Sequence, residues 1–217
     1  IISISILSIS ITILRWNLTL SGGGVIMKRK IVVASNLLEK KNYGDYTFPI
    51  DFDYNTLFAY EYGFLDYHWH YEMTFSVILE GSMEYRVNDK IYEMKKGDGL
   101  FINSHTLHTA KGYNNKDCAF LALMFRPNFI FGHEESIIKT KYIDIIENGG
   151  QCPSFFFNSN NKTHQKIMSL VLEANDIFQN KGPCYELLVK SKVCEIWSLF
   201  FNEVSFILQE DNVSNSN

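Results

Sequence analysis

One short stretch of the sequence carries the side chains with the clearest chemical potential. His68, His70, Glu72 and Thr74 follow one another at intervals of two residues. On a β-strand, residues spaced in this way face the same side. Two imidazoles and a carboxylate on one face can converge on a single ligand or metal ion. We therefore expect a strand over residues 68–80 whose polar face looks into a pocket.

A third imidazole can reach the same place from further along the chain. The stretch GDGLFINSHTLH, residues 97–108, brings His105 and His108 after a Gly-Asp turn. A turn followed by a strand would return His108 to the pocket. Zinc, iron or manganese accepts three imidazoles and a carboxylate, so His68, His70 and His108 are candidate metal ligands. The alternative is that the histidines are polar residues of an exposed strand.

The elements that must position these residues are strands first and helices second. Between residues 56 and 131, short apolar segments alternate with turn signals such as Asn88-Asp89 and Gly97-Asp98-Gly99. Many short strands at near-regular spacing are typical of a β-sandwich or a small barrel. The segments expected to form strands are 57–63, 74–81, 82–90, 91–99, 100–104 and 119–125.

After Pro127 the spacing of apolar residues becomes helical. We expect three helices, over residues 132–150, 159–182 and 184–210, and a frayed polar tail over residues 211–217. The predicted fold class is therefore mainly β with C-terminal helices.

The last predicted helix is apolar on more than one face. Its first stripe consists of Val189, Val193, Ile196, Phe200 and Val204, and its second of Trp197, Phe201 and Leu208. A helix resting on a barrel needs one such stripe, so the second favours a symmetric dimer through this helix. A charged residue at Phe200 or Phe201 should then give a folded monomer. The alternative is that both faces are buried within one chain.

The composition limits the possible classes of function. The chain has 217 residues and is 46% hydrophobic, enough for an ordinary domain with a real core. Its formal net charge of −4 argues against binding nucleic acid through the overall field of the chain. Its four cysteines form no CxxC pair, which favours reduced thiols in a cytoplasmic protein over a zinc knuckle.

The first 26 residues have an unusual character. The segment IISISILSISITILRWNLTL is apolar, but Ser, Thr and Arg15 interrupt it, so it fits neither a signal peptide nor a membrane span. The first methionine is Met27, shortly after three glycines whose codons would resemble a ribosome-binding site. We expect residues 1–26 to be upstream sequence read in frame and disordered. The competing interpretation is an Ile-rich strand that pairs with the domain.

The histidine stretches also resemble a known family. They are similar to the two cupin motifs, and most closely to the sensing domain of AraC-family transcription regulators. The segment PCYELLVKSKVCEIWSLFFN resembles the linker helix of those regulators, and the resemblance covers about residues 50–205. The matching residues are Gly63, His68, His70 and Gly81 for the first motif, and Gly97, Asp98, Asn103 and His108 for the second.

The resemblance implies a fold and a division of the chain. The fold would be a cupin, or jelly-roll, barrel followed by a helical segment. An N-terminal arm would cover residues 27–52, an effector-binding barrel residues 53–132, and a helical linker and dimerisation region residues 133–210.

Two departures from the family pattern change the expected chemistry. Metal-binding cupins carry a glutamate four residues after the second histidine, where this chain has Thr74. A neutral hydroxyl is a weak ligand, so we expect no cofactor beyond a weakly bound divalent metal. Family members also carry two helix-turn-helix units after the linker helix. None is recognisable before Asn217, so we expect no DNA binding by this chain alone.

Three functions remain open at this point. The one that the resemblance favours is an effector-sensing and dimerisation domain of a cytoplasmic transcription regulator, without enzymatic activity. Its effector would be a small molecule such as a sugar, contacted by polar side chains. The first alternative is a small metal-dependent cupin isomerase or dioxygenase, and the second a structural dimer module with a vestigial pocket. The candidate ligand-binding residues are His68, His70, Glu72, Thr74 and His108.

Overall fold

The computed structural model describes residues 28–147 and 152–214. Its eight strands all pair antiparallel to their neighbours. The strands are β1 (Ile50–Thr56), β2 (Phe64–His68), β3 (Met73–Val87), β4 (Lys90–Lys95), β5 (Gly99–Ile102), β6 (His108–Gly112), β7 (Cys118–Phe125) and β8 (Ser154–Phe157). The helical segments are η1 (Leu57–Ala59), η2 (Tyr113–Asn115), α2 (Asn128–Phe131), η3 (Lys139–Ile143), α3 (Asp144–Glu147), α4 (Lys162–Asn180) and α5 (Tyr185–Ser214).

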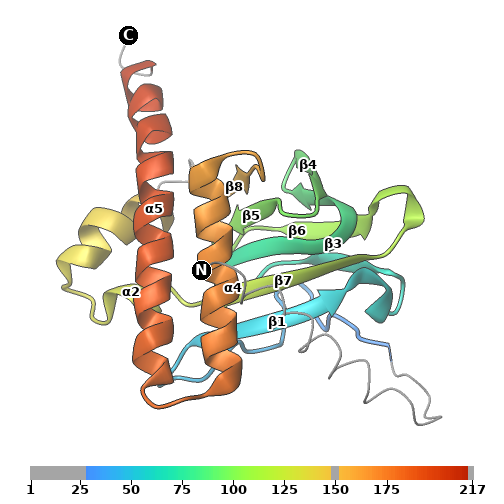
Figure 1. Cartoon of the computed structure of the whole chain (residues 1–217). Helices are drawn as coiled ribbons and strands as arrows, with labels where there is room; N and C mark the ends of the chain where they lie inside the picture. The colour runs from blue at the N-terminus through green and yellow to red at the C-terminus, as the bar shows by residue number, and fades with distance from the viewer. Residues whose placement is uncertain (1–27, 148–151, 215–217) are drawn as a thin grey trace.

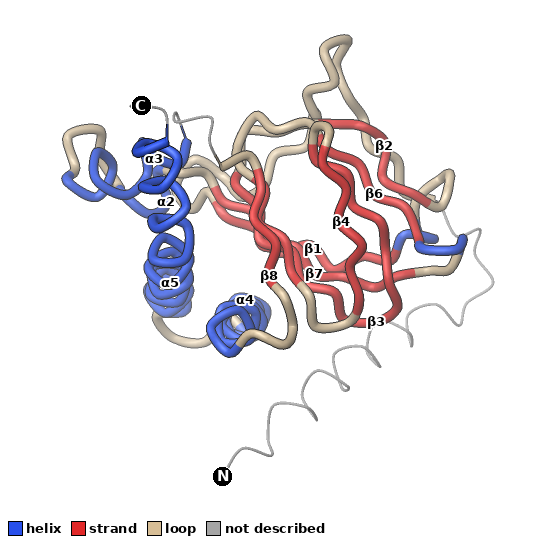
Figure 2. The backbone as a smooth tube through the Cα atoms, turned by 90° about the horizontal axis from the view of Figure 1, so that it is seen from above, coloured by secondary structure: helices blue, strands red, loops and turns tan. Residues whose placement is uncertain are grey.

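The strands form a barrel, and in Figure 2 they are seen to surround a common interior. One side is the sheet β1-β7-β3-β5-β8, and the other contains β4, β3, β6 and β2. Strand β3 belongs to both sides, because its first half pairs with β5 and β7 and its second half with β4 and β6. A register shift between Ile78 and Glu80 and a φ of +78° at Gly81 bend the strand there. A Cβ at Gly81 would lie 2.6 Å from the carbonyl oxygen of Asp117, so the close approach requires glycine.

The sheet that contains β1 and β8 is buried on both faces. Along β3, Phe75 and Val77 face the helices, whereas Thr74 and Ser76 face the interior of the barrel. The same alternation along β7 buries all its residues. This explains why residues 119–125 read as an unbroken apolar run rather than an alternating one.

Helices α4 and α5 lie side by side as an antiparallel pair against this sheet (Figure 1). The ring of Phe200 lies 4.3 Å from that of Phe101, and Phe200 is fully buried. Trp197 is 3% exposed, and its Nε1 donates a hydrogen bond to the carbonyl oxygen of Tyr142. The view that Phe200 would face a partner is therefore wrong. The described part of both stripes packs largely within the chain, as the alternative proposed.

The order of strands followed by helices is confirmed, but several predicted segments differ. Residues 57–63 form η1, a single bridge from Tyr60 to Arg29 and a turn rather than a strand. Strands β1, β2, β6 and β8 lie outside the predicted strand segments, and the segments 74–81 and 82–90 form the single strand β3. Strand β8 pairs with β5 and lies between two of the predicted helices.

The helical predictions need two corrections. The helix predicted over residues 132–150 begins only at residue 137 and runs to residue 147 among the described residues, as a helical turn followed by η3 and α3, and α2 precedes it. Its Gly-Gly end and the leader over residues 1–26 lie outside the described residues. Helix α5 continues to Ser214, beyond the end predicted at residue 210. Among the helices of the described residues, none has the length and apolar character to cross a membrane.

Candidate functional site

A cavity of about 340 Å³ opens inside the barrel. Its walls come from β1, β2, β3, β6 and β7 and from the arm that precedes β1. Its polar lining is Arg29, Lys30, Glu39, Lys41, Tyr43, Asp53, Asn55, Tyr60, His68, His70, Thr74, Ser76, Tyr85 and His108. A cavity with convergent polar groups over an apolar floor is typical of a small-molecule site.

Three of the predicted histidines meet in this cavity. His68 ends β2 and lies directly opposite His108, the first residue of β6. Their ring centroids are 4.2 Å apart, and those of His70 and His108 are 5.1 Å apart. One ring nitrogen from each of the three lies within 4.8 Å of the others, and all three side chains are buried.

The single strand expected over residues 68–80 is wrong, although it led to the correct pair of histidines. The backbone stays extended through Trp69, which bridges to Leu38, so His68 and His70 still share a side. It then bends at Tyr71 and Glu72 before β3 begins.

Backbone carbonyls fix the tautomers of the three imidazoles. Each Nδ1 lies next to a carbonyl oxygen: His68 next to Asp66 at 2.7 Å, His70 next to Glu72 at 2.9 Å, and His108 next to Thr106 at 2.8 Å. A carbonyl can only accept, so each Nδ1 carries the hydrogen and each Nε2 keeps its lone pair. The free nitrogens of the triad are therefore all acceptors.

Burial keeps this triad uncharged. It lowers the pKa of His70 to about 3, and it lowers the pKa values of His68 and His108 as well. For His108 the two neighbouring imidazoles lower the pKa further. Neutral acceptors this close cannot satisfy one another by hydrogen bonds. They fit a ligand that brings either several donors or a cation.

Thr74 adds a fourth group to the same wall. Its side chain is buried at 3% exposure, and its Oγ1 has no hydrogen-bond partner among the described residues. Ser76, two residues on, is equally buried and also lines the cavity. An unpaired buried hydroxyl is uncommon in proteins, and a bound ligand is one way to satisfy it.

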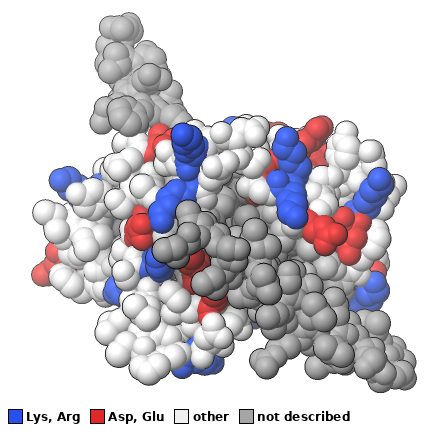
Figure 3. Space-filling model, viewed as in Figure 1, with Lys and Arg blue, Asp and Glu red and all other residues white. Residues whose placement is uncertain are grey.

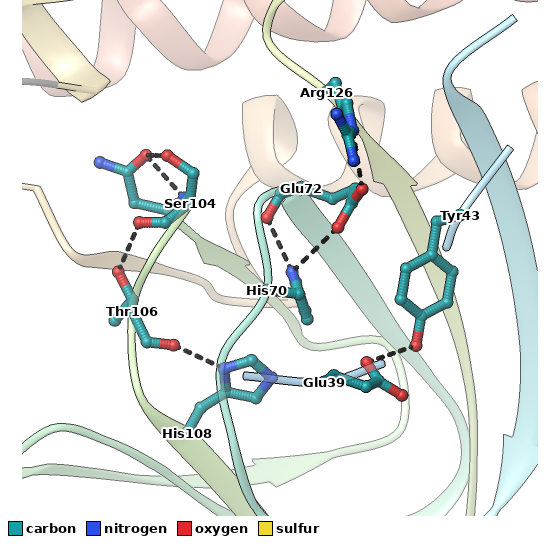
Figure 4. A network of polar contacts seen from close by, with 9 residues as sticks. Glu39, Tyr43, His70, Glu72, Ser104, Thr106, His108 and Arg126 are labelled. Carbon is teal, nitrogen blue, oxygen red and sulfur yellow. Dashed lines mark hydrogen bonds and ion pairs between the residues drawn. The ribbon is translucent and has the colours of Figure 1, made fainter. Parts of the chain in front are cut away.

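Glu72 is placed differently from the other candidate residues. It does not line the cavity, and its Oε1 accepts a hydrogen bond from Arg126 Nε at 3.2 Å (Figure 4). The bend that ends the extended segment takes this side chain off the cavity wall, although its Oε2 stays 3.9 Å from Nδ1 of His70. His105 also stays outside: it is exposed, has a left-handed φ of +60°, and donates its N–H to the carbonyl of His70.

The sequence patterns did not identify the polar residues at the mouth of the cavity. Asp53 accepts from Lys41 at 2.9 Å and from Arg29 at 3.1 Å. Burial alone would raise the pKa of Asp53, but these two cations outweigh it and lower the pKa. The only sequence pattern that could have pointed to these residues is the alternation of Asp53 and Asn55, which places both on one face of β1. Nothing in the spacing of the arm placed its residues here.

A second polar pair from the arm lies beside the triad. The hydroxyl of Tyr43 donates to Glu39 at 2.9 Å, and the Tyr43 ring packs edge-on against His70 at 5.8 Å. Burial raises the pKa of the Glu39 carboxyl, and it raises the pKa of the Tyr43 hydroxyl together with the nearby Glu39 charge. The arm thus supplies one wall of the site.

The donor set of the triad fits a divalent transition metal, since three neutral imidazoles with free Nε2 atoms are common ligands of such ions. His68, His70 and His108 would hold it, and it would act as a Lewis acid toward a bound oxygen. The set lacks an acidic ligand, because Thr74 stands on the wall where a carboxylate would add negative charge.

Comparisons with known proteins agree with the geometry. Residues 51–188 match the family model described as "AraC-like ligand binding domain". The chain is 27% identical over 169 residues to the uncharacterized HTH-type transcriptional regulator YdeC of Bacillus subtilis (strain 168). That alignment covers 78% of the chain and 57% of the relative, so the chain spans little more than half of the relative's length.

Solved structures add little to this assignment. A cupin protein from Bacteroides fragilis has a TM-score of 0.32 at 16% identity, over 41% of this chain and 75% of its own. A predicted oxalate decarboxylase from Thermotoga maritima has a TM-score of 0.28 at 30% identity, over 29% of this chain and 56% of its own. Scores this low carry no argument, whereas the family model covers most of the chain. The chain belongs to the family of AraC-like ligand-binding domains.

Proposed function

We propose that this chain is the effector-sensing part of a cytoplasmic transcription regulator and has no enzymatic activity of its own. The observation that carries the proposal is the convergence of three neutral imidazole acceptors on the cavity inside the barrel. The expected effector is a small molecule with several hydrogen-bond donors, such as a sugar. Its hydroxyls would donate to the Nε2 atoms of the triad and engage Thr74.

The test is direct binding to the purified chain. Compounds with several hydroxyls are titrated by calorimetry, and any that binds is repeated with two variants. His108→Leu removes a cavity acceptor and should weaken binding at least tenfold, because a buried ligand donor loses its partner. His133→Leu changes an exposed histidine outside the cavity and should leave affinity unchanged. Equal affinity in both variants would remove the triad from the site.

A second candidate is a metal site, which the three converging nitrogens also favour. In that case the purified chain carries one equivalent of a tightly held transition metal, and a metal-dependent cupin activity becomes the better hypothesis. If metal binds only weakly, Thr74→Glu should raise its affinity by supplying the missing negative ligand. An unchanged affinity would mean that residue 74 does not reach the ion.

We also propose a homodimer, on different grounds from those expected. Among the described side chains of α5, the large apolar ones that are exposed are Leu187, at 70%, and Leu188, at 50%. Two further apolar side chains of the helical part are exposed just before η3, Ile137 at 73% and Ile138 at 39%. Leu187→Glu should convert the dimer to a monomer in light scattering at micromolar concentration. Ile91→Glu, a similar change on β4, should not, and a monomeric unmodified chain would refute the dimer.

DNA binding belongs, in this proposal, to the full regulator, as the name of the HTH-type relative suggests. On the visible part of the face in Figure 3, basic and acidic residues are interspersed rather than gathered into a basic stripe. With a net charge of −4, the chain alone should show no salt-sensitive affinity for duplex DNA in an anisotropy titration. Such affinity would contradict this division of roles.

A further inference from the structure

Glu72 is a buried acid that the ligand cavity does not use. Its side chain is 3% exposed and lies on the short connection between β2 and β3. Burial of a carboxylate is unfavourable unless a cation compensates it. In the described part of the chain, the cation that contacts it is Arg126, with Nε 3.2 Å from Oε1.

The same carboxylate also lies close to the cavity. Its Oε2 is 3.9 Å from the Nδ1 of His70, whose hydrogen now goes to the Glu72 carbonyl at 2.9 Å (Figure 4). Glu72 therefore stands between an imidazole that lines the cavity and a guanidinium outside it. At present its shorter side-chain contact is with Arg126.

Arg126 connects this pair to the helices. It follows β7 directly, and its carbonyl accepts from the N–H of Phe129 at 2.8 Å, in the first turn of α2. In α2, Ile130 is buried in the same core as Trp197 of α5. A movement of Arg126 would therefore change the packing of α2 against α5.

We propose that Glu72 and Arg126 are positioning residues that couple His70 to the packing of α2 against α5. The proposal rests on the proposed function, because it assumes that the cavity takes a ligand. A ligand that engages Nε2 of His70 withdraws electron density from the ring and makes Nδ1–H a stronger donor. The carboxylate of Glu72 then moves toward His70, and its hold on Arg126 weakens. No covalent bond changes in this exchange.

A simpler role for the pair is charge neutralisation alone. In that case the ion pair would stabilise the fold, but a change at His70 would not reach the helices through it. The two roles differ in additivity, because residues that act through one another give non-additive effects when changed together.

The experiment measures hydrogen–deuterium exchange of the full chain in four forms: unmodified, His70→Ala, Arg126→Met and the double variant. His70→Ala removes the imidazole that competes with Arg126 for the carboxylate of Glu72, so it tests the coupling without requiring a known ligand. Because Glu72 then stays with Arg126, we expect this variant to slow exchange in α2 and in the first half of α5 by about threefold or more. In the Arg126→Met background, His70→Ala should not change the exchange rates of these helices any further.

Two controls and a substitute variant complete the design. Arg126→Lys keeps the cation, so His70→Ala should still change the exchange rates of α2 and α5 in this background. Arg86→Met removes a cation from the second half of β3, and His70→Ala should have its full effect in that background too. If Arg126→Met does not fold, Glu72→Gln replaces it, since an amide keeps the shape and removes the charge.

Two results would overturn the coupling. One is an equal effect of His70→Ala with and without Arg126, and the other is no effect on α2 and α5 in either background. Neither result bears on effector binding, which calorimetry tests separately. Failure of the coupling can therefore be distinguished from failure of the proposed function.

Discussion

Replacing Thr74 with valine should stabilise the ligand-free chain. Valine keeps the shape of the side chain and removes the Oγ1 that has no partner among the described residues. A buried hydroxyl without a hydrogen bond costs about 1–3 kcal/mol. Because the new methyl group would lie in a partly polar cavity, we expect the low end, about 1 kcal/mol. In a chain of this size, that raises the melting temperature by about 2–4 °C.

Urea denaturation at constant pH measures the change, and Thr106→Val is the matched control. Thr106 is also buried, but its hydroxyl donates to the carbonyl of Ser104 at 3.3 Å, so this variant should lose about 1 kcal/mol. The reasoning is refuted if Thr74→Val is no more stable than the unmodified chain while Thr106→Val behaves as expected. The same Thr74→Val variant should bind an effector less tightly, since it has lost a polar contact.

Three further predictions concern the core and the buried histidines. Phe200→Ala should lower the free energy of unfolding by about 3–5 kcal/mol in urea denaturation, because the ring is fully buried among other aromatics, and a loss below 1 kcal/mol would contradict that packing. Gly99→Ala should cost about 1–3 kcal/mol, because its Cβ would lie 2.0 Å from the sulfur of Met168, and Met168→Ala should relieve part of the cost. The metal-free chain should lose stability as the pH falls from about 6.5 toward 3, because the histidines bind protons in the unfolded chain but stay neutral when buried in the folded one. His70 alone contributes roughly 2 kcal/mol to the loss at pH 5, so His70→Gln should flatten the dependence in that range.

Local patterns predicted the parts of the fold that depend on local geometry. The turn at Asn88-Asp89 joins β3 to β4 as a two-residue hairpin, with Asn88 in the left-handed region that such turns require. The periodicity of α4 was equally clear, and its N-cap Asn161 accepts from two backbone N–H groups. These features involve neighbours in the sequence, so the sequence alone was sufficient.

The missed strands depend on distant partners. Strand β1 contains Asp51, Asp53 and Asn55, residues that disfavour strands, yet Lys41 and Arg29 hold the carboxylate of Asp53 in place. Strand β8 has only four residues and is defined by its pairing with β5. No periodicity within either segment carries that information.

The sequence likewise predicted some residues of the candidate site correctly and misplaced others. Alternation brought His68 and His70 together, and the expected turn and strand over residues 97–108 added His108. The bend at Tyr71 could not be read from residue types, so Glu72 was assigned to the cavity although its partner, Arg126, follows 54 residues later. An ion pair over such a separation leaves no trace in local spacing.

The shared aromatic core between the sheet and the helices has a consequence for how such a chain can evolve. Phe75 of β3, Phe157 of β8 and Phe200 of α5 pack in one cluster, with the ring of Phe75 within 5.8 Å of each of the other two. If either the strands or the helices were exchanged for an unrelated sequence, the other part would lose the aromatic side chains that complete its core. The inheritable module is therefore the barrel together with its helical pair. Recombination between genes should preserve this block together with the arm that packs on it, with viable crossover points before the arm or beyond the packed turns of α5.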